Sequence, residues 1–121
     1  MNLKFERARA EEELIKYIAQ KLGWNYLNTE QIRCLHSYNS SSKCNSRISG
    51  SQKIFCDVFK IKPSYVIELL QPNFEKLTNQ QKTRQLIIAL LHIPKTFSGE
   101  TKKFLDLTEN DIQKLYEKVI I

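Results

Sequence analysis

Few side chains in this sequence could bind a metal ion or act as a nucleophile. They are two histidines, His36 and His92, and three cysteines, Cys34, Cys44 and Cys56. The cysteines are odd in number and irregularly spaced, without the paired spacing of a zinc site or the even set of a disulfide framework. We therefore expect reduced thiols that serve as small buried hydrophobic side chains.

Two arrangements of these side chains could still carry chemistry. Cys34 and His36 are alternate residues of a predicted strand and so share a face, as a nucleophilic pair would, but many unreactive pairs do the same. His92 could bind a metal ion if His36 or a cysteine folded beside it. Alternatively, His92 stabilises the C-terminal end of a buried helix, where a cationic or hydrogen-bonding side chain is favoured.

Length and composition exclude several classes of protein. With 121 residues, 41% of them hydrophobic and 26% charged, the chain can bury a core as a single domain over residues 1–121. No apolar run could span a membrane and the polar N-terminus lacks a signal-peptide core, so we expect a cytoplasmic protein without a membrane partner. The isolated glycines Gly23, Gly50 and Gly99 exclude the Gly-rich phosphate loops of kinases, NTPases and dinucleotide-binding proteins.

Positive charge is concentrated in the middle of the chain. Between Arg33 and Lys103 there are twelve basic and four acidic residues, a local charge of +8, against +6 for the whole chain. Such a region is typical of a protein that binds nucleic acid or an acidic surface, although lysines scattered over solvated faces give the same count. The residues that we expect to form the contact surface are Arg33, Lys43, Arg47, Lys53, Lys60, Lys62, Lys102 and Lys103.

A serine-rich segment, residues 37–51, brings hydroxyl groups to this basic region. Hydroxyls, amide side chains and cations are the groups that contact phosphate oxygens, and Tyr38 could stack on an unpaired base. A solvated loop without any ligand would have the same composition. Both interpretations stay open at the level of the sequence.

The hydrophobic pattern predicts the elements that position these residues. Apolar residues recur at helical spacing over residues 5–22, and Gly23 is expected to end that helix. Four further elements are predicted before residue 71: a strand at 31–38, a short strand around 47–48, a helix at 54–59 and a strand at 64–70.

Two helices with capping signals complete the chain. Thr78 begins the first, with Gln81 in the capping-box position, and this helix is expected to end at residue 93. Its second half is apolar on every side except at His92, which predicts a buried helix. The last helix is expected to begin at Thr108. The order of the elements predicts an α+β fold, with a small mixed sheet packed against helices around a buried central helix.

The central helix and the residues around it resemble a known family. The strand Tyr65–Glu68 and above all the run Leu86–Gly99 (LIIALLHIPKTFSG) are similar to the small metallopeptidases of archaea and phages. The resemblance extends upstream through residues 34–40 and 47–48, so it covers most of the chain. It implies a zincin-like minimal core, in which one helix carries the motif His-Glu-Leu-Leu-His-Ile-Pro and a third histidine follows downstream.

The zinc-binding residues of that family are largely replaced in this chain. A zincin needs two histidines four residues apart to bind Zn²⁺, and a glutamate beside the first to take a proton from the bound water. The first histidine position is Ile88, the glutamate position is Ala89, and only the vestigial His92 is retained. No histidine occurs in residues 100–104, where the third ligand is expected. The resemblance therefore implies a degenerate copy without catalytic residues, metal or cofactor, in which Ile88 is expected to have joined the core.

We interpret the chain as a non-catalytic pseudo-metallopeptidase that binds a macromolecule through its basic central face. Degenerate enzymes can persist on viruses and mobile elements as regulators or inhibitors of host machinery. The expected partner is a nucleic-acid-handling protein such as RNA polymerase, or nucleic acid itself. The alternatives are a protein that binds nucleic acid directly and an active metal-dependent hydrolase or peptidase with a site rebuilt around His92.

Overall fold

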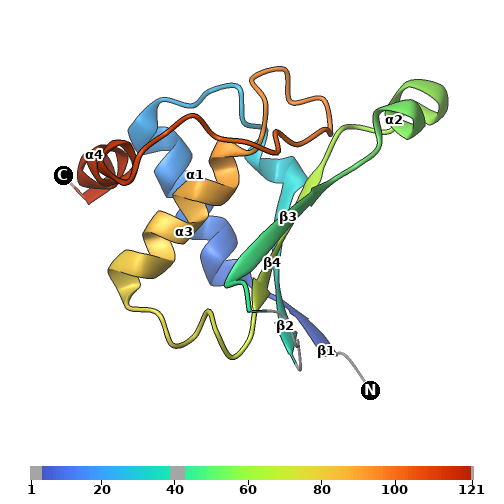
Figure 1. The fold of residues 1–121 in the computed structure, drawn as a ribbon. Helices are drawn as coiled ribbons and strands as arrows, with labels where there is room; N and C mark the ends of the chain where they lie inside the picture. The colour runs from blue at the N-terminus through green and yellow to red at the C-terminus, as the bar shows by residue number, and fades with distance from the viewer. Residues whose placement is uncertain (1–3, 39–42, 121) are drawn as a thin grey trace.

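The chain forms an α+β protein with four strands and four helices, as the sequence predicts (Figure 1). The structure, a computed structural model, describes residues 4–38 and 43–120, apart from the side chains of residues 53–55. The strands are β1 (Lys4–Arg7), β2 (Ile32–Tyr38), β3 (Ser46–Gly50) and β4 (Tyr65–Leu70). The helices are α1 (Arg9–Leu22), α2 (Lys53–Phe59), α3 (Asn79–Leu91) and α4 (Glu109–Ile120), and a 3-10 turn, Thr29–Gln31, precedes β2.

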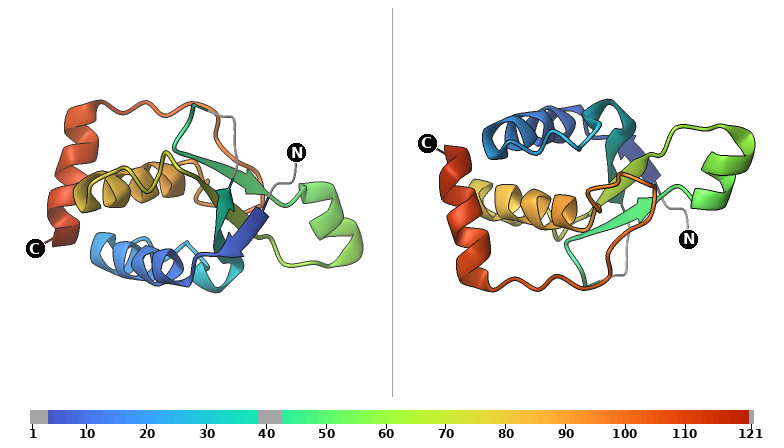
Figure 2. Two further views of the ribbon diagram at one scale, coloured as in Figure 1. Left: turned by 90° about the horizontal axis from the view of Figure 1, so that it is seen from below. Right: turned by 90° about the horizontal axis from the view of Figure 1, so that it is seen from above.

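The strands form one mixed sheet, as predicted, in the order β1-β2-β4-β3. β2 and β4 are parallel at its centre, whereas β1 and β3 pair antiparallel with them at the two edges. Helices α1 and α3 lie against one face, and α4 packs across this pair on the side away from the sheet (Figure 2). The edge strand β3 therefore lies beside α3, and no helix of the described residues covers the opposite face of the sheet.

The hydrophobic core lies between the sheet and the pair of helices. Because strand side chains alternate between the two faces, every second residue of β2 and β4 points toward the helices. Fully buried members of the core include Ile32, Cys34, Ile67 and Leu69 from the sheet, Ile15 and Ile18 from α1, and Leu86, Ile87 and Leu90 from α3. Burying each large apolar side chain contributes about 1.5–3 kcal/mol, so this contact fixes the rotation of α3 about its own axis.

Helix α3 begins at the predicted capping box but is not buried on every side. The Thr78 hydroxyl accepts from the backbone N–H of Gln81 at 3.2 Å, and the Gln81 side chain accepts from the backbone N–H of Thr78 at 2.9 Å. The prediction of a wholly buried second half is wrong, as is the expectation that Ile88 belongs to the core. Ile88 is only partly buried, because the sheet covers a different side of the helix.

The N-terminal segment differs from the single helix predicted over residues 5–22. Residues 4–7 form β1, and α1 begins after them. Phe5 and Ala8 fit a helical spacing, but antiparallel pairing with β2 satisfies the backbone of this segment instead and leaves Phe5 54% exposed. The end of the helix is as predicted, since Gly23 adopts the left-handed conformation with a φ of 67°.

The other predicted elements are confirmed with small shifts at their ends. Thr108 and Asp111 exchange hydrogen bonds of 2.9 and 3.2 Å between backbone N–H groups and side-chain oxygens at the start of α4. The strand expected around residues 47–48 is β3. Residues 39–42 of the serine-rich segment lie outside the described residues, so neither interpretation of the segment is tested there.

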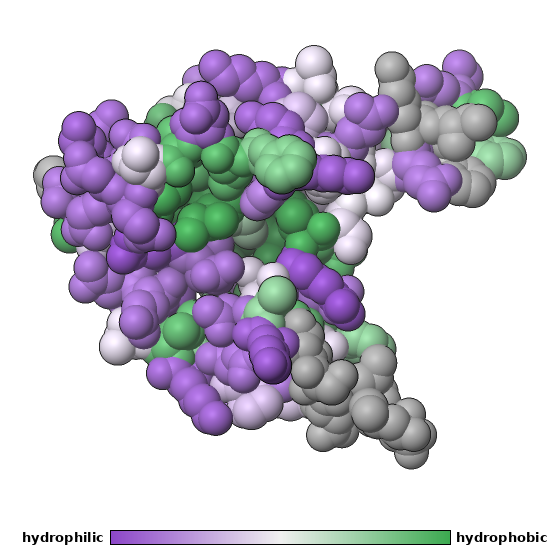
Figure 3. Space-filling view, viewed as in Figure 1, coloured by the Kyte–Doolittle hydropathy of each residue, from purple (hydrophilic) through white to green (hydrophobic). Residues whose placement is uncertain are grey.

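Helix α2 projects away from the rest of the molecule at the end of an arm, residues 51–64 (Figures 1 and 2). A hydrogen bond of 3.0 Å from the backbone N–H of Ser51 to the carbonyl oxygen of Ser64 closes the base of the arm. Val58 and Phe59 are 63% and 62% exposed, and Figure 3 shows hydrophobic residues at the outer end of the arm. Among the described residues, none of the helices is long and apolar enough to cross a membrane.

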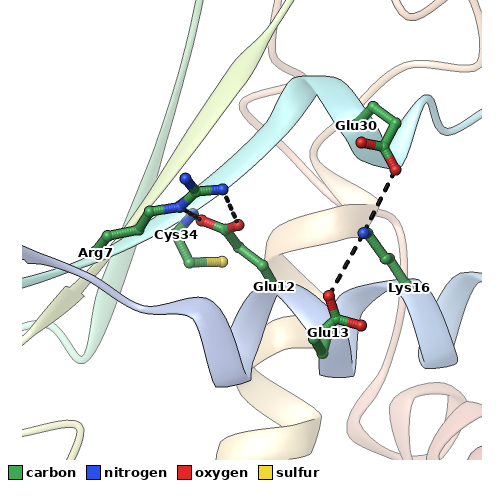
Figure 4. A network of polar contacts seen from close by, with 6 residues as sticks. All are labelled: Arg7, Glu12, Glu13, Lys16, Glu30 and Cys34. Atoms are coloured by element: carbon green, nitrogen blue, oxygen red, sulfur yellow. Dashed lines mark hydrogen bonds and ion pairs between the residues drawn. The ribbon is translucent and has the colours of Figure 1, made fainter.

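The buried carboxylate of Glu12 joins α1 to two strands (Figure 4). Arg7 donates to it from Nε at 3.0 Å and from Nη2 at 2.8 Å, and the backbone N–H of Cys34 donates at 3.1 Å. The hydrogen bond from Arg7, followed by that from Cys34, holds the pKa of Glu12 below its ordinary value despite the opposing effect of burial. One ionised side chain thus ties the start of α1 to both β1 and β2.

We expect Glu12→Gln to lower the free energy of unfolding at neutral pH by about 1 kcal/mol or more, because the buried N–H of Cys34 loses its charged acceptor. Since the folded-state pKa lies below the ordinary 4.5, the wild-type protein should lose this contribution as the pH falls from that value through the folded pKa. Urea unfolding at pH 7 and at about pH 3 measures both effects.

The matched control is Glu13→Gln, which removes an exposed carboxylate that pairs with Lys16 at 3.5 Å. This substitution should change stability little, because exposed ion pairs contribute little. An equal loss of stability on acidification in Glu12→Gln and wild-type protein would contradict the role given to Glu12.

Candidate binding cleft

A cleft of about 250 Å³ opens between α3, the edge strand β3 and the segment that joins α3 to α4. We call this segment, residues 94–108, the strap. Figure 3 shows that the side of the molecule seen there has a hydrophobic area at its centre, bordered by hydrophilic residues. The residues that line the cleft are Ser46, Arg47, Ile48, Gln85, Ile88, Ala89, His92, Thr101, Lys102 and Lys103.

Helical periodicity brings the α3 residues to the cleft. Burial of Leu86, Ile87 and Leu90 against the core directs the side of the helix that carries Gln85, Ile88, Ala89 and His92 toward β3 and the strap. The positions that the resemblance assigns to a zinc motif therefore do line one cleft. Sequence reasoning placed these positions together, but it did not identify Gln85, one turn before Ile88, as a neighbour.

Two hydrogen bonds between His92 and Lys102 hold the strap against the end of α3. The backbone N–H of Lys102 donates to the carbonyl oxygen of His92 at 2.7 Å. In return, Nδ1 of His92 donates to the carbonyl oxygen of Lys102, since a carbonyl can only accept. The imidazole of His92 thus bonds to the strap, whereas only its backbone N–H bonds to its own helix, at the carbonyl oxygen of Ala89. Nε2 is the ring nitrogen left for other contacts.

Tyr65 provides a second attachment for the strap. Its hydroxyl donates to the carbonyl oxygen of Glu100 at 2.7 Å and accepts from the backbone N–H of Gly99 at 2.9 Å. The ring, which is fully buried, meets Phe97 edge to face with 5.0 Å between centroids. Several residues of the run that carries the family resemblance therefore attach the strap to the sheet.

The strap also approaches the end of β3 so closely that only glycines fit. A Cβ atom on Gly50 would lie 1.9 Å from the carbonyl oxygen of Gly99. One on Gly99 would lie 2.4 Å from the carbonyl oxygen of Ser51, and the φ of 95° at Gly99 itself favours glycine. These contacts place Thr101 and the residues after it at the rim of the cleft.

The structure brings three of the predicted binding residues together and separates the others. Arg47, Lys102 and Lys103 are among the residues that line the cleft, but the Arg47 side chain pairs with Glu68 at 2.8 Å on the uncovered face of the sheet, because Arg47 alternates with Ser46 and Ile48. Arg33 lies on the uncovered face of the sheet, by strand alternation with buried Cys34. The remaining ones lie on other parts of the surface or outside the described side chains: Lys43 precedes β3, Lys60 and Lys62 belong to the arm, and the Lys53 side chain is not described.

Two polar residues of the cleft were missed by sequence reasoning. Gln85 donates from Nε2 to the Ser46 hydroxyl oxygen at 2.8 Å, which links α3 to β3 across the floor of the cleft. Thr101 lies at the opposite rim. No sequence motif marks Gln85, because its contact with Ser46 joins positions that are 39 apart in the chain.

The cysteines and His36 do not gather around His92. Cys34 is fully buried, and burial, reinforced by the charges of Glu12 and Glu11, raises the pKa of its thiol to about 12. It is therefore no nucleophile at neutral pH. The expectation of three buried thiols is confirmed for Cys34 and Cys56 and wrong for Cys44, which lies exposed before β3.

His36 has partners of its own in another part of the molecule. Gln71 donates from Nε2 to its Nδ1 at 2.8 Å, because the Gln71 oxygen already accepts from the backbone N–H of Glu75 at 3.1 Å. Nε2 of His36 then faces the Glu11 carboxylate at 3.9 Å. The interpretation of Cys34 and His36 as a reactive pair is not supported, since these contacts occupy the histidine.

We expect Gly50→Ala to push the strap away from β3, because the added methyl group would overlap the carbonyl oxygen of Gly99. The free energy of unfolding should fall by about 1–3 kcal/mol. The backbone amide of Lys102 should exchange faster with solvent, since its bond to His92 loosens. Ser49→Ala, on the exposed side of the same strand, is the control, and unchanged exchange at Lys102 in Gly50→Ala would contradict the close contact.

The residues present do not fit the zinc ion that the resemblance implies. Ile88 and Ala89 offer hydrocarbon where a histidine and a glutamate are needed, so only His92 could bind a metal. Within the ranges that the structure describes, no group of three or more histidine, cysteine, aspartate or glutamate residues could hold a metal ion. Neither His36 nor a cysteine joins His92 in such a group.

Comparison with known proteins agrees with the resemblance. Residues 3–120 match the model of the family described as "Putative phage metallopeptidase". No curated protein and no solved structure matches the chain. Because the family model spans nearly the whole sequence, the chain belongs to the phage metallopeptidase family.

Proposed function

We propose that this metallopeptidase-like protein is a non-catalytic member of its family that binds a macromolecule through the cleft. The observation that carries the proposal is the lining of the cleft. Two positions of the zinc motif, Ile88 and Ala89, are hydrocarbon, and two lysines, Lys102 and Lys103, stand at the rim. Such a surface suits binding of an anionic partner better than activation of a metal-bound water.

Loss of the ligands has left a cleft that is still well formed. His92 keeps a role without a metal, because it bonds to both the N–H and the carbonyl of Lys102. Tyr65 and the glycine contacts hold the rest of the strap. Attachment of the strap backbone at Lys102 supports a binding role, since less backbone freedom is lost when a partner docks.

The partner that we propose is the machinery that handles nucleic acid in the host, such as RNA polymerase, with the protein acting as a regulator or inhibitor. Two observations support it. The chain belongs to a phage family, and its charge of +8 between Arg33 and Lys103 suits surfaces that are acidic or carry nucleic acid. Two of these basic residues, Lys102 and Lys103, lie together at the rim of the cleft.

Affinity capture from a lysate of the native host tests the proposal, with the tagged chain and with and without nuclease. We expect a stoichiometric nucleic-acid-handling protein in the wild-type capture. It should be depleted in Lys102→Glu/Lys103→Glu, because the charge of the rim is reversed there. The matched control is Lys114→Glu/Lys118→Glu, which makes the same charge change on the exposed side of α4.

Two results would contradict the proposal. One is equal capture of the same proteins by wild type and by the cleft variant. The other is hydrolysis of peptides by the purified wild-type chain that a chelator abolishes and zinc restores, because the protein would then be an enzyme.

A further inference from the structure

The chemistry of the cleft lining favours an anion. Among the described residues that line it, none is an aspartate or a glutamate, whereas Lys102 and Lys103 are cationic. Arg47 is paired with Glu68 of the neighbouring strand β4, which is not part of the lining. A concave surface with positive charges at its rim concentrates the positive electrostatic potential and attracts negatively charged groups.

Hydroxyl groups in the cleft also favour an anionic ligand, because they can donate hydrogen bonds to it. The Ser46 hydroxyl oxygen accepts from Gln85, so its own hydrogen is available to a ligand. Thr101 supplies a second hydroxyl at the opposite rim. Hydroxyl and ammonium groups arranged in this way match the non-bridging oxygens of a phosphate, which accept several hydrogen bonds at once.

The state of Arg47 favours phosphate over carboxylate. A planar carboxylate is best bound by a guanidinium fork, but Nε and Nη2 of Arg47 already donate to Glu68 at 2.9 and 2.8 Å. The other two cations, Lys102 and Lys103, are ammonium groups, which bind phosphate as point charges without a planar requirement. Their backbone is held by the bonds between Lys102 and His92.

Cations beyond the cleft indicate a chain of phosphates rather than one anion. Lys43 precedes β3, and Arg33 lies on the uncovered face of the sheet two strands away from β3, about 10 Å at the usual strand spacing. Neither of these cations lines the cleft, so a single phosphate bound there would not contact them. A polyanion that leaves the cleft around β3 could reach both of them.

We propose that the cleft between α3, β3 and the strap binds a phosphate of a nucleic-acid backbone, at the place where the family resemblance puts a metal ion. The inference rests on the proposed function, because it takes the cleft to be a binding site. Within the machinery that handles nucleic acid, it assigns the contact made by the cleft to the nucleic acid rather than to the protein. In this proposal, the place that binds a metal cation in a metallopeptidase binds a phosphate anion in this chain.

Fluorescence anisotropy with a labelled single-stranded oligonucleotide of about twelve nucleotides tests the inference. Binding by the wild-type chain should weaken with added salt. Lys102→Glu/Lys103→Glu should lose affinity on the order of tenfold or more and show a shallower salt dependence, because phosphate contacts are lost. Lys114→Glu/Lys118→Glu, with the same net charge, should stay close to wild type, and circular dichroism checks the folding of each variant.

Equal losses in the two double variants would overturn the inference, because net charge alone would then explain binding. Failure to bind the oligonucleotide, together with binding of a labelled poly-glutamate peptide that the cleft variant loses, would also overturn it in favour of an acidic protein segment. If affinity capture still depends on Lys102 and Lys103 while no oligonucleotide binds, the phosphate site fails but the proposed function stands. The two proposals are therefore separable.

Discussion

Helix α3 can bury only one side of itself against the sheet, and the rest of the site depends on this constraint. Leu86, Ile87 and Leu90 are fully buried in the core, so the helical period turns Ile88 and His92 toward the edge strand β3. In a metallopeptidase the same rotation would present two metal ligands to a substrate cleft. Here it presents one hydrocarbon side chain and one histidine to a cleft with a cationic rim. One side of α3 packs in the core and another side lines the cleft. The residues of the cleft can therefore change without loss of the packing that holds the fold.

The strap gives His92, the histidine at the second position of the family's metal motif, a structural role. The Nδ1–H of a histidine that ligates a metal is commonly held by a carbonyl or carboxylate, which orients the ring. His92 makes a bond of that type to the carbonyl oxygen of Lys102, and the N–H of Lys102 bonds back to the carbonyl oxygen of His92. The contact that would orient a ligand therefore also positions a lysine of the rim. Glu12 plays a comparable part at the other side of the molecule, where one carboxylate joins α1, β1 and β2.

Much of the fold could be predicted from local signals, whereas the cleft could be predicted only in part. The capping box at Thr78 and the left-handed Gly23 were recognisable because each acts on its own few residues. Strand β1 was missed because its stability comes from pairing with β2, about 30 residues away in the chain. The resemblance located Ile88 and His92 but misplaced Ile88 in the core, since apolar character alone does not show which side of a helix the sheet covers. Gln85 carried no signal, because its contact with β3 is made only by the tertiary fold.

The central claim is that the cleft is a binding site for an anionic partner. An NMR titration of the ¹⁵N-labelled chain with a short single-stranded oligonucleotide tests it most directly, because each backbone amide reports its own surroundings. We expect saturable shifts concentrated at β3, at the end of α3 and at strap residues 101–103, with little change in α4. Shifts confined to the arm at residues 51–64, or spread evenly over all the basic residues, would contradict it.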